Sequence, residues 1–292
     1  MPAGAVHIIV NPISGQGQDG RFIAELVRHL TLRGFRVEVQ PTRHAGHARE
    51  LARAAPDDAH CIVSIGGDGT HRDVLSGLLG RPVPVCVVPS GTENVLGRTF
   101  RLMPTLQDTL RRIQTGRPAA IDLGLANQCP FVMFSGIGFD AAVTQAVHRN
   151  RRGRIFRDAY YGQIARLLWR YGFPALAVTV DGRPLADDAG FVLVANTPLY
   201  ADRMRMAPQA IGDDGLLDVV CFRARSPWKI LELYLHVRRG RHLTHPLVAY
   251  AQGRRIEVTC AEAAVPTQVD GDAVMTTPVT HTVMPKAVRL LV

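Results

Sequence analysis

The sequence predicts an α/β N-terminal domain with a doubly wound parallel sheet and a mainly antiparallel, β-sandwich-like C-terminal domain. In the first part of the chain, apolar β-branched runs alternate with stretches whose apolar residues recur at helical spacing. After Ile121, strand-like runs dominate and Asp-Gly turns separate them, which favours antiparallel hairpins. The length of 292 residues allows two substantial cores. We expect residues 1–121 to form the first domain, to which strand 287–292 returns, and residues 122–286 to form the second.

The first domain is expected to contain four strands. They are Val6–Val10, a short strand around Val37 and Val39, Ile62–Ile65, and Val83–Val88. Helices are expected around Phe22–Leu30, Ala48–Ala54 and Val74–Leu79. Three of the strands end in loops rich in Gly, Ser, Thr and Asn, and ligands of such sheets bind beyond the carboxyl ends of the strands. We therefore expect these loops to converge on one edge.

The second domain is expected to be built from short strands with two helical stretches between them. The strands are 131–134, 176–180, 191–195, 216–222, 255–260, 267–269 and 288–292. Apolar stripes predict helices over 164–171 and 230–237. Trp169 and Trp228, which lie in or beside these stripes, are expected in the core or in a pocket wall.

A strand that runs into Gly66-Gly67-Asp68-Gly69-Thr70 and then into a helix predicts an anion site. Amides at a helix N-terminus point outward, and glycine lets the backbone approach a phosphate. Asp68 would repel a phosphate, so its carboxylate indicates an intervening magnesium ion or its waters. The alternative is a tight turn whose aspartate caps the helix.

Composition narrows the class of protein. The net charge of +9 suggests an acidic partner, but nucleic acid is not expected, because no basic, aromatic-interleaved surface is evident. Lys229 and Lys286 are the only lysines, so a Walker-type P-loop is excluded.

Five widely spaced cysteines fit reduced thiols of a cytoplasmic protein. We expect no signal peptide and no transmembrane segment, since no apolar run approaches roughly 18 residues.

A dinucleotide fingerprint is a weaker interpretation of the first loop. Gly15, Gly17 and Gly20 have the spacing of that motif. Four residues separate the first strand from Gly15, however, whereas the fingerprint places its first glycine directly at the strand end. This spacing argues against a Rossmann dehydrogenase.

Several motifs occur together in a fixed order. In the first half they are Asn11-Pro12-x-Ser14-Gly15, Thr42, Gly66-Gly67-Asp68-Gly69-Thr70 and Pro89-x-Gly91-Thr92-x-Asn94. In the second half they are Ile121-Asp122-Leu123-Gly124, Gly136-Ile137-Gly138-Phe139-Asp140, Ala207-Pro208, Asp213-Asp214-Gly215-Leu216-Leu217-Asp218 and Val269-Asp270-Gly271-Asp272. With this set, the chain resembles the diacylglycerol kinase-like lipid kinases, which include bacterial lipid kinases and sphingosine kinases, over nearly its whole length.

The resemblance implies ATP-dependent phosphorylation of a hydroxyl of diacylglycerol or a related lipid, with a sphingoid base included. It implies ATP and Mg²⁺ as cofactors, with the nucleotide in a cleft between the two domains. The residues implied to contact the nucleotide are Asn11, Pro12, Ile13, Ser14, Gly15, Thr42, Gly66, Gly67, Asp68, Gly69, Thr70, His71, Arg72 and Thr92. A lipid at the membrane surface is the implied partner, and a homodimer is left open.

The resemblance also assigns the catalytic and metal residues. Asp272 takes the position of the base that accepts the hydroxyl proton, and Asp68 is the second catalytic residue. Asp68 and Asp122 are implied to place the catalytic magnesium through its waters. Asp214, with the carbonyls of Ile211 and Leu216, is implied to hold a structural magnesium. Ordinary turns remain the alternative at both Asp-Gly sites.

Four departures from the family pattern bear on activity and on the identity of the lipid. The family usually has Glu where this chain has Asp272 and Asp73, and a second acid where it has Val95. Residues 201–204 replace a glycine-rich segment. A catalytically weak nucleotide-binding regulator is therefore kept as an alternative. NAD kinase, which shares the Gly-Gly-Asp-Gly-Thr motif, is a second alternative.

Arginines 149–157 could dock on the inner membrane face or form a solvated surface.

Overall fold

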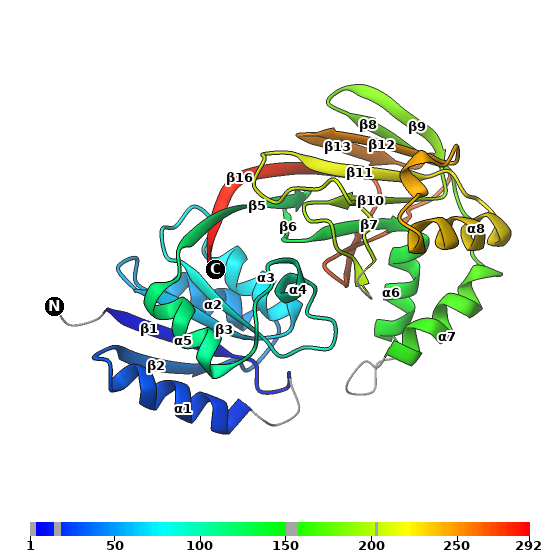
Figure 1. Cartoon of the computed structure of the whole chain (residues 1–292). Helices are drawn as coiled ribbons and strands as arrows, with labels where there is room; N and C mark the ends of the chain where they lie inside the picture. Colours follow the sequence, from blue (N-terminus) through cyan, green and yellow to red (C-terminus); the bar gives the residue numbers. More distant parts are fainter. Residues whose placement is uncertain (1–3, 15–18, 150–156, 202–203) are drawn as a thin grey trace. The chain divides into compact units, whose positions relative to one another are not determined.

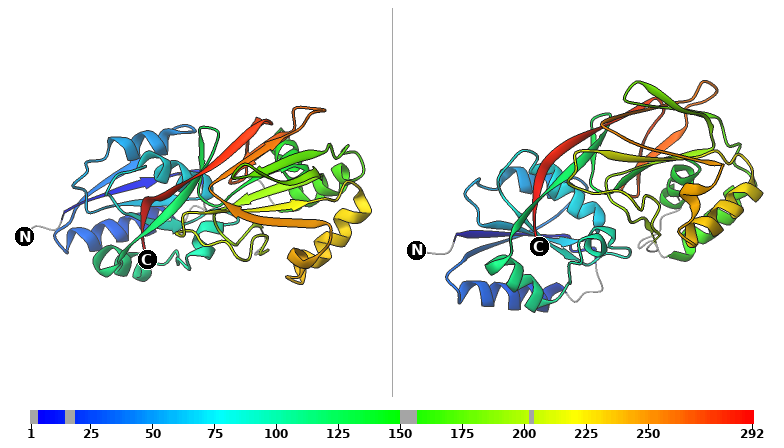
Figure 2. Two further views of the ribbon diagram at one scale, coloured as in Figure 1. Left: turned by 90° about the horizontal axis from the view of Figure 1, so that it is seen from above. Right: turned by 45° about the horizontal axis from the view of Figure 1, so that its top comes forward.

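The computed structural model describes residues 4–14, 19–149, 157–201 and 204–292, which form two compact units. Unit 1 comprises Met1–Asp122 and Lys286–Val292, and unit 2 comprises Leu123–Pro285. Strands β5 (Pro118–Ala126) and β16 (Val279–Leu291) each contain residues of both units. Figure 2 shows β16, at the red end of the colour bar, as one continuous strand.

Unit 1 is built on a parallel sheet in the order β2-β1-β3-β4, with the end of β16 beside β4. Its strands are β1 (Ala5–Val10), β2 (Arg36–Pro41), β3 (Cys61–Gly66) and β4 (Val85–Pro89). Its helices are α1 (Asp19–Thr31), α2 (His47–Ala54), α3 (Asp68–Gly77), α4 (Val95–Thr99) and α5 (Leu106–Thr115). Strand β3 is buried along its whole length because helices cover both faces of the sheet.

The core of unit 1 follows the alternation of side chains along the strands. Alternate residues such as Ile8 and Val63 pack against Leu26 and Leu30 of α1 and Ile113 of α5. The other face carries α2 and α3 (Figure 1). This arrangement leaves the carboxyl ends of β1, β3 and β4 for the loops that carry the predicted site.

Unit 2 contains two packed antiparallel sheets. Its strands, besides parts of β5 and β16, are β6 (Cys129–Phe131), β7 (Phe134–Gly138), β8 (Leu176–Val180), β9 (Arg183–Ala189), β10 (Phe191–Ala195), β11 (Leu217–Phe222), β12 (Val248–Gly253), β13 (Arg255–Thr259), β14 (Pro266–Val269) and β15 (Asp272–Thr276). One sheet has the order β12-β11-β10-β7-β14-β15, and the other contains β16-β13-β8-β9. The apolar residues between them form one core, so the predicted fold class is confirmed.

The described part of unit 2 also contains the α-helices α6 (Phe139–Arg149), α7 (Arg157–Leu168) and α8 (Pro227–Arg238) and the short 3₁₀ helix η2 (His242–Thr244) (Figure 1). The helical stretches expected over 164–171 and 230–237 correspond to α7 and α8, whereas the sequence pattern does not predict α4, α5 or α6. Trp169 and Trp228, expected in the core or a pocket wall, are exposed, and this prediction is wrong. Of the arginine run 149–157, residues 150–156 lie outside the described residues.

The strand predicted over 131–134 is interrupted in the structure. Strand β6 ends at Phe131 and β7 begins at Phe134. Between them, the amides of Val132, Met133 and Phe134 all donate to the carboxylate of Asp270. At this point the backbone amides therefore donate to the carboxylate of a residue far along the chain and not to the carbonyls of a neighbouring strand.

Candidate active site

Asn11 joins the loop after β1 to helix α3. Its backbone N–H donates to the carbonyl of Ile65 (3.0 Å), and its side-chain Nδ2 donates to Thr70 Oγ1 (3.1 Å). Its Oδ1 accepts the N–H of Ile13 (3.1 Å), and Ser14 Oγ donates to its carbonyl (2.8 Å). One asparagine thus fixes both the shape of the first loop and its position against the first turn of α3.

The loops after β3 and β4 touch each other at glycine. A Cβ built on Gly91 would lie 2.7 Å from the Cα of Gly67. The N–H of Ser90 donates to the carbonyl of Gly66 (2.7 Å), and the hydroxyls of Ser14 and Ser90 are 3.2 Å apart. The predicted convergence of the three loops is therefore confirmed. Ser90 was not singled out from the sequence, although its place in a polar loop directly after a strand was a usable signal.

The close approach of these loops leads to a testable prediction. We expect Gly91→Ala to lower the free energy of unfolding by about 1–3 kcal/mol, because the new methyl group meets backbone that must shift. Gly20→Ala is the matched control, since a Cβ at Gly20, at the start of α1, meets nothing within 4 Å. Urea denaturation of both variants measures the difference. Equal stability of the two variants would contradict the tight contact.

Asp68 is the first residue of α3, but its carboxylate binds another helix. Its Oδ2 accepts the N–H of Val95 (3.0 Å), and its Oδ1 accepts the N–H of Leu96 (3.1 Å), so Asp68 caps α4. Asn94, the residue directly before α4, has a left-handed backbone (φ 51°) and does not cap the helix with its side chain. Its Oδ1 accepts the N–H of Gly91 at 2.7 Å. Burial raises the pKa of Asp68, and the two amides act in the opposite direction. Asp68 therefore ties α3 to the β4 loop.

The side chains of His71 and Arg72 do not fit the predicted role in nucleotide binding. His71 is buried, and its ring Nδ1 lies 2.8 Å from Ser64 Oγ. Its backbone N–H donates to the carbonyl of Gly67 (3.1 Å). Burial lowers the pKa of His71 to about 3, so the ring is neutral. Arg72 is also buried, with its guanidinium 3.9 Å from the Asp73 carboxylate. These side chains support α3 from within unit 1.

The other predicted nucleotide residues occupy the loop surface. Pro12, Ile13 and Thr92 are exposed, and Gly69 lies in the first turn of α3. Thr42 is half-buried, and its N–H donates to the carbonyl of Val10 (2.8 Å). Gly15 lies outside the described residues. Their contacts with a nucleotide stay a prediction.

Asp122 is buried, and its Oδ1 accepts the N–H of Lys286 at 2.6 Å. This bond holds the returning C-terminal segment beside β5 within unit 1. The contact gives Asp122 a structural role, and its implied role in placing magnesium stays a prediction.

In unit 2, the turn that carries Asp272 is held by its neighbours. Both oxygens of Asp270 accept backbone amides of residues 132–134. Gly271 N–H donates to Gln268 Oε1 (2.8 Å), and Gln268 Nε2 donates to Asp140 Oδ2 (2.9 Å). Tyr200 donates its hydroxyl hydrogen to the other oxygen of Asp140. Nothing in the sequence singled out Gln268, because its partner lies 128 residues away.

Asp272 itself is half-exposed at the start of β15. Its Oδ1 lies 4.0 Å from Nδ1 of His148, which is on α6. Asp270 and Gly271 both have positive φ angles (46° and 89°), which glycine adopts without strain at the second position. A rigid turn thus presents the Asp272 carboxylate at the surface of unit 2.

The turn predicted to hold a structural magnesium has oxygen atoms at its surface. Asp214 Oδ1 accepts the N–H of Leu216 (3.0 Å), and Asp214 N–H lies 3.5 Å from the carbonyl of Ile211. Gly215 gives the tight turn with φ 76°. Burial and, to a smaller extent, the Asp214 charge raise the pKa of Asp218 nearby. A carboxylate beside backbone carbonyls fits a hard cation.

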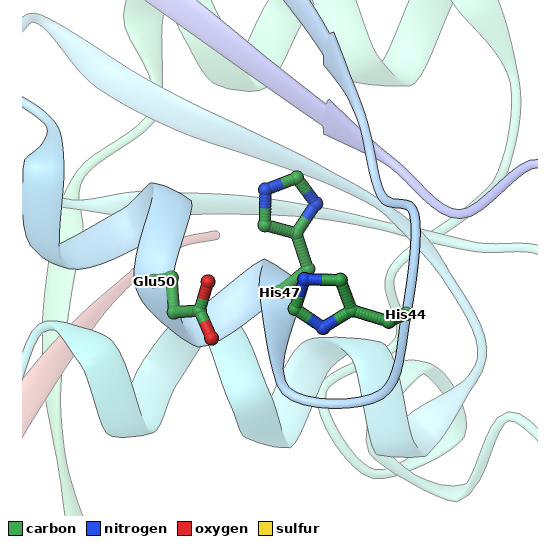
Figure 3. A group of neighbouring side chains, drawn as sticks. All are labelled: His44, His47 and Glu50. Atoms are coloured by element: carbon green, nitrogen blue, oxygen red, sulfur yellow. The ribbon is translucent and has the colours of Figure 1, made fainter.

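His44, His47 and Glu50 form a cluster at the start of α2 (Figure 3). One potential ligand atom from each lies within 4.8 Å of the others. His44 Nδ1 donates to the carbonyl of Ala45, which leaves its Nε2 lone pair free. His47 Nδ1 accepts the N–H of Arg43, so in the neutral ring the hydrogen is on Nε2 and no lone pair remains. In this arrangement the cluster offers two ligands, fewer than a stable zinc site requires.

Comparison with known proteins covers almost the whole chain. Residues 5–126 match the family described as the diacylglycerol kinase catalytic domain, and residues 134–292 match the YegS C-terminal NAD kinase beta sandwich-like domain. A diacylglycerol kinase of Mycobacterium tuberculosis is 27% identical over 296 residues, which cover 99% of this chain and 95% of that protein. A diacylglycerol kinase of Staphylococcus carnosus is 25% identical over 269 residues, which cover 91% of this chain and 88% of that protein.

A solved structure has the same fold. A candidate diacylglycerol kinase from Bacillus anthracis superposes with a TM-score of 0.81 at 20% identity, over 100% of this chain and 96% of that chain. The two matched families lie one after the other along the chain. The protein belongs to the diacylglycerol kinase-like lipid kinases and is a phosphotransferase.

Proposed function

We propose that this enzyme transfers the γ-phosphate of ATP to a hydroxyl of diacylglycerol or a related lipid, a sphingoid base included. In this proposal, residues 1–121 form the nucleotide domain and residues 122–286 form the lipid-substrate domain. The observation that carries the proposal is the convergence of the three loops, through Asn11 with Thr70, Ser14 with Ser90, and Gly67 against Gly91. Backbone amides and hydroxyls gathered at one sheet edge suit a polyphosphate.

The binding roles follow from what these loops offer. The N-terminal turn of α3 presents amides, and the helix dipole favours negative charge there. The residues around Asn11, Gly67 and Thr92 position the phosphates, while Thr42 lies on the adjoining loop. Because phosphoryl transfer depends mainly on positioning and charge neutralisation, fixed loops are the main contribution of unit 1.

Asp68 and Asp122 are the proposed magnesium residues of unit 1. An ionised carboxylate has about four acceptor directions, and the described contacts of Asp68 use two of them. The remaining directions fit waters around a cation. Magnesium, when bound, neutralises charge on the transferring phosphate. We propose a second, structural magnesium at Asp214, Ile211 and Leu216.

Asp272 is the proposed base. It accepts the proton of the lipid hydroxyl as that oxygen attacks the γ-phosphorus, and ADP leaves. The turn held by Asp270, Gly271 and Gln268 gives the carboxylate a fixed direction, which offsets the shorter reach of Asp compared with Glu.

We propose that the enzyme works as a peripheral protein on the inner face of the membrane. All five cysteines are free thiols, which supports a reducing compartment. None of the helices in the described residues has the length and apolar character needed to cross a bilayer.

A kinase assay with radiolabelled ATP tests the proposed function. Diacylglycerol, sphingosine and related lipids are offered as acceptors, and NAD is included because the C-terminal match is described as NAD kinase-like. The expected result is a labelled lipid that disappears with Asp68→Ala. Labelling of NAD alone would support the NAD kinase alternative, and ATP binding without any transfer would support the regulator.

The proposed structural magnesium gives a separate prediction. We expect millimolar Mg²⁺ to raise the melting temperature of the wild-type protein, because a ligand that binds only the folded state stabilises it, by about 2.7 kcal/mol at a concentration of 100 times Kd. Asp214→Asn removes the charged ligand and should abolish most of this shift. Asp213→Asn, at the exposed neighbouring position, is the matched control. A shift of equal size in all three proteins would contradict the site.

A further inference from the structure

An aromatic and aliphatic surface is exposed on α7 and α8 of unit 2. Trp169 directly follows α7 and is 59% exposed, and Trp228 lies in the first turn of α8 and is 70% exposed. Their rings meet edge to face with centroids 5.2 Å apart. Large apolar side chains in such a patch, rather than singly, mark an interaction site on a folded protein. We call Trp169, Trp228, Leu231, Tyr234 and Leu235 the α7–α8 surface.

Helix α8 has an apolar face toward the protein and another toward solvent. Leu233 and Val237 are buried against unit 2. Trp228, Leu231 and Leu235 follow helical spacing of i, i+3 and i+7 on the other side, where Leu231 is 40% and Leu235 50% exposed. Exposed apolar side chains that gather on one side of a helix, as these do, mark an interaction surface.

The surroundings of this surface are basic. Segments 162–173 and 226–241 contain six basic residues and one acid, Glu232. The basic residues are Arg166, Arg170, Lys229, Arg238, Arg239 and Arg241, and all of them are exposed. Glu232 already faces His245, whose Nε2 lies 3.2 Å from its carboxylate. The partner that complements this surface is therefore apolar with an anionic rim.

We propose that the α7–α8 surface docks the enzyme on the headgroup region of an anionic lipid bilayer. Tryptophan and tyrosine rings occupy that region because they combine an apolar body with a polar edge. Arginine and lysine around them attract anionic headgroups. A second copy of the chain is the poorer partner, because a symmetric contact would set the two basic rims against each other. The inference rests on the lipid substrate of the proposed function, which supplies the reason to meet a membrane.

The chain itself provides the probe. Trp169 and Trp228 are its only tryptophans, so intrinsic tryptophan fluorescence reports on this surface alone. With vesicles of phosphatidylcholine and phosphatidylglycerol, we expect a blue shift and quenching by brominated acyl chains. With phosphatidylcholine alone, or at high salt, both effects should be much smaller. Unchanged fluorescence with anionic vesicles would overturn the proposal.

Variants give the second measurement. We expect Trp169→Ala and Trp228→Ala together to weaken flotation with anionic vesicles by roughly tenfold or more, because each ring buries a large apolar area at the interface. Leu32→Ala, an exposed leucine of unit 1, is the matched control and should bind as the wild type does. Flotation of the double variant at wild-type affinity would overturn the proposal, and so would a vesicle-free dimer in sedimentation that the double variant abolishes.

Kinase activity separates this proposal from the proposed function. On a short-chain diacylglycerol dissolved in detergent, the double variant should keep wild-type activity, whereas on vesicles it should lose roughly tenfold, in line with its binding. Wild-type protein that docks on vesicles but phosphorylates no lipid would refute the proposed function and leave the docking surface standing. Equal loss in detergent and on vesicles would refute the docking role.

Discussion

Replacing Asp272 with alanine is expected to lower kcat for lipid phosphorylation by about 10²–10⁴-fold, the usual contribution of a positioned general base. The carboxylate stands on a turn that Asp270 and Gln268 hold in place, so removing it deletes the proposed proton acceptor without disturbing the turn. Because Asp272 is half-exposed and its φ does not depend on glycine, the substitution should leave folding intact. Steady-state transfer of labelled phosphate measures the effect.

Two further variants show whether the loss comes from the base itself. Asp272→Asn keeps the shape of the side chain and removes its basicity, so its kcat should fall as far as that of the alanine variant. Asp272→Glu restores the residue usual in the family and should retain or raise activity. ATP affinity, measured by calorimetry, should stay at the wild-type value in all three, since the loops proposed to bind the nucleotide belong to unit 1. Wild-type kcat in the alanine variant would rule out Asp272 as the base.

The sequence was most informative where local pattern and chemistry agree. The apolar runs of β1, β3 and β4 and the polar loops after them predicted that these loops meet at one sheet edge, and the contacts of Asn11 and Ser90 confirm that meeting. The Asp-Gly turns predicted the antiparallel sheets of unit 2 correctly. Both predictions rest on patterns within a few residues or on the geometry of a single sheet.

The sequence was less informative where a side chain acts over a long separation. Asp68 looked like a metal residue or the cap of its own helix, yet it caps α4, which begins 27 residues later. Asp270 interrupts a predicted strand 136–138 residues earlier by taking three of its amides. His71 follows a phosphate-type turn, but helical geometry turns its ring into the core against Ser64. Such pairings depend on tertiary packing that no local pattern contains.

The two hydrogen bonds that α4 donates to Asp68 also bear on the second large effect that we expect. Asp68→Ala should reduce kcat by roughly 10²–10³-fold, because it removes the negative charge proposed to balance magnesium at the phosphates and frees the loop after β4. It should also lower the free energy of unfolding by about 0.5–2 kcal/mol, the cost of a lost helix cap. Labelled-ATP kinetics and urea denaturation measure the two quantities.

Thr105→Ala separates the two consequences of losing Asp68. Thr105 is the N-cap of α5, where its Oγ1 accepts the N–H of Asp108 at 3.2 Å, so its loss should cost similar stability. It takes no part in the proposed site, and kcat should remain at the wild-type value. If Thr105→Ala reduced kcat as strongly as Asp68→Ala, the loss would reflect destabilisation of unit 1. If only Asp68→Ala does so, then the carboxylate of Asp68 acts in catalysis in addition to its role as a cap.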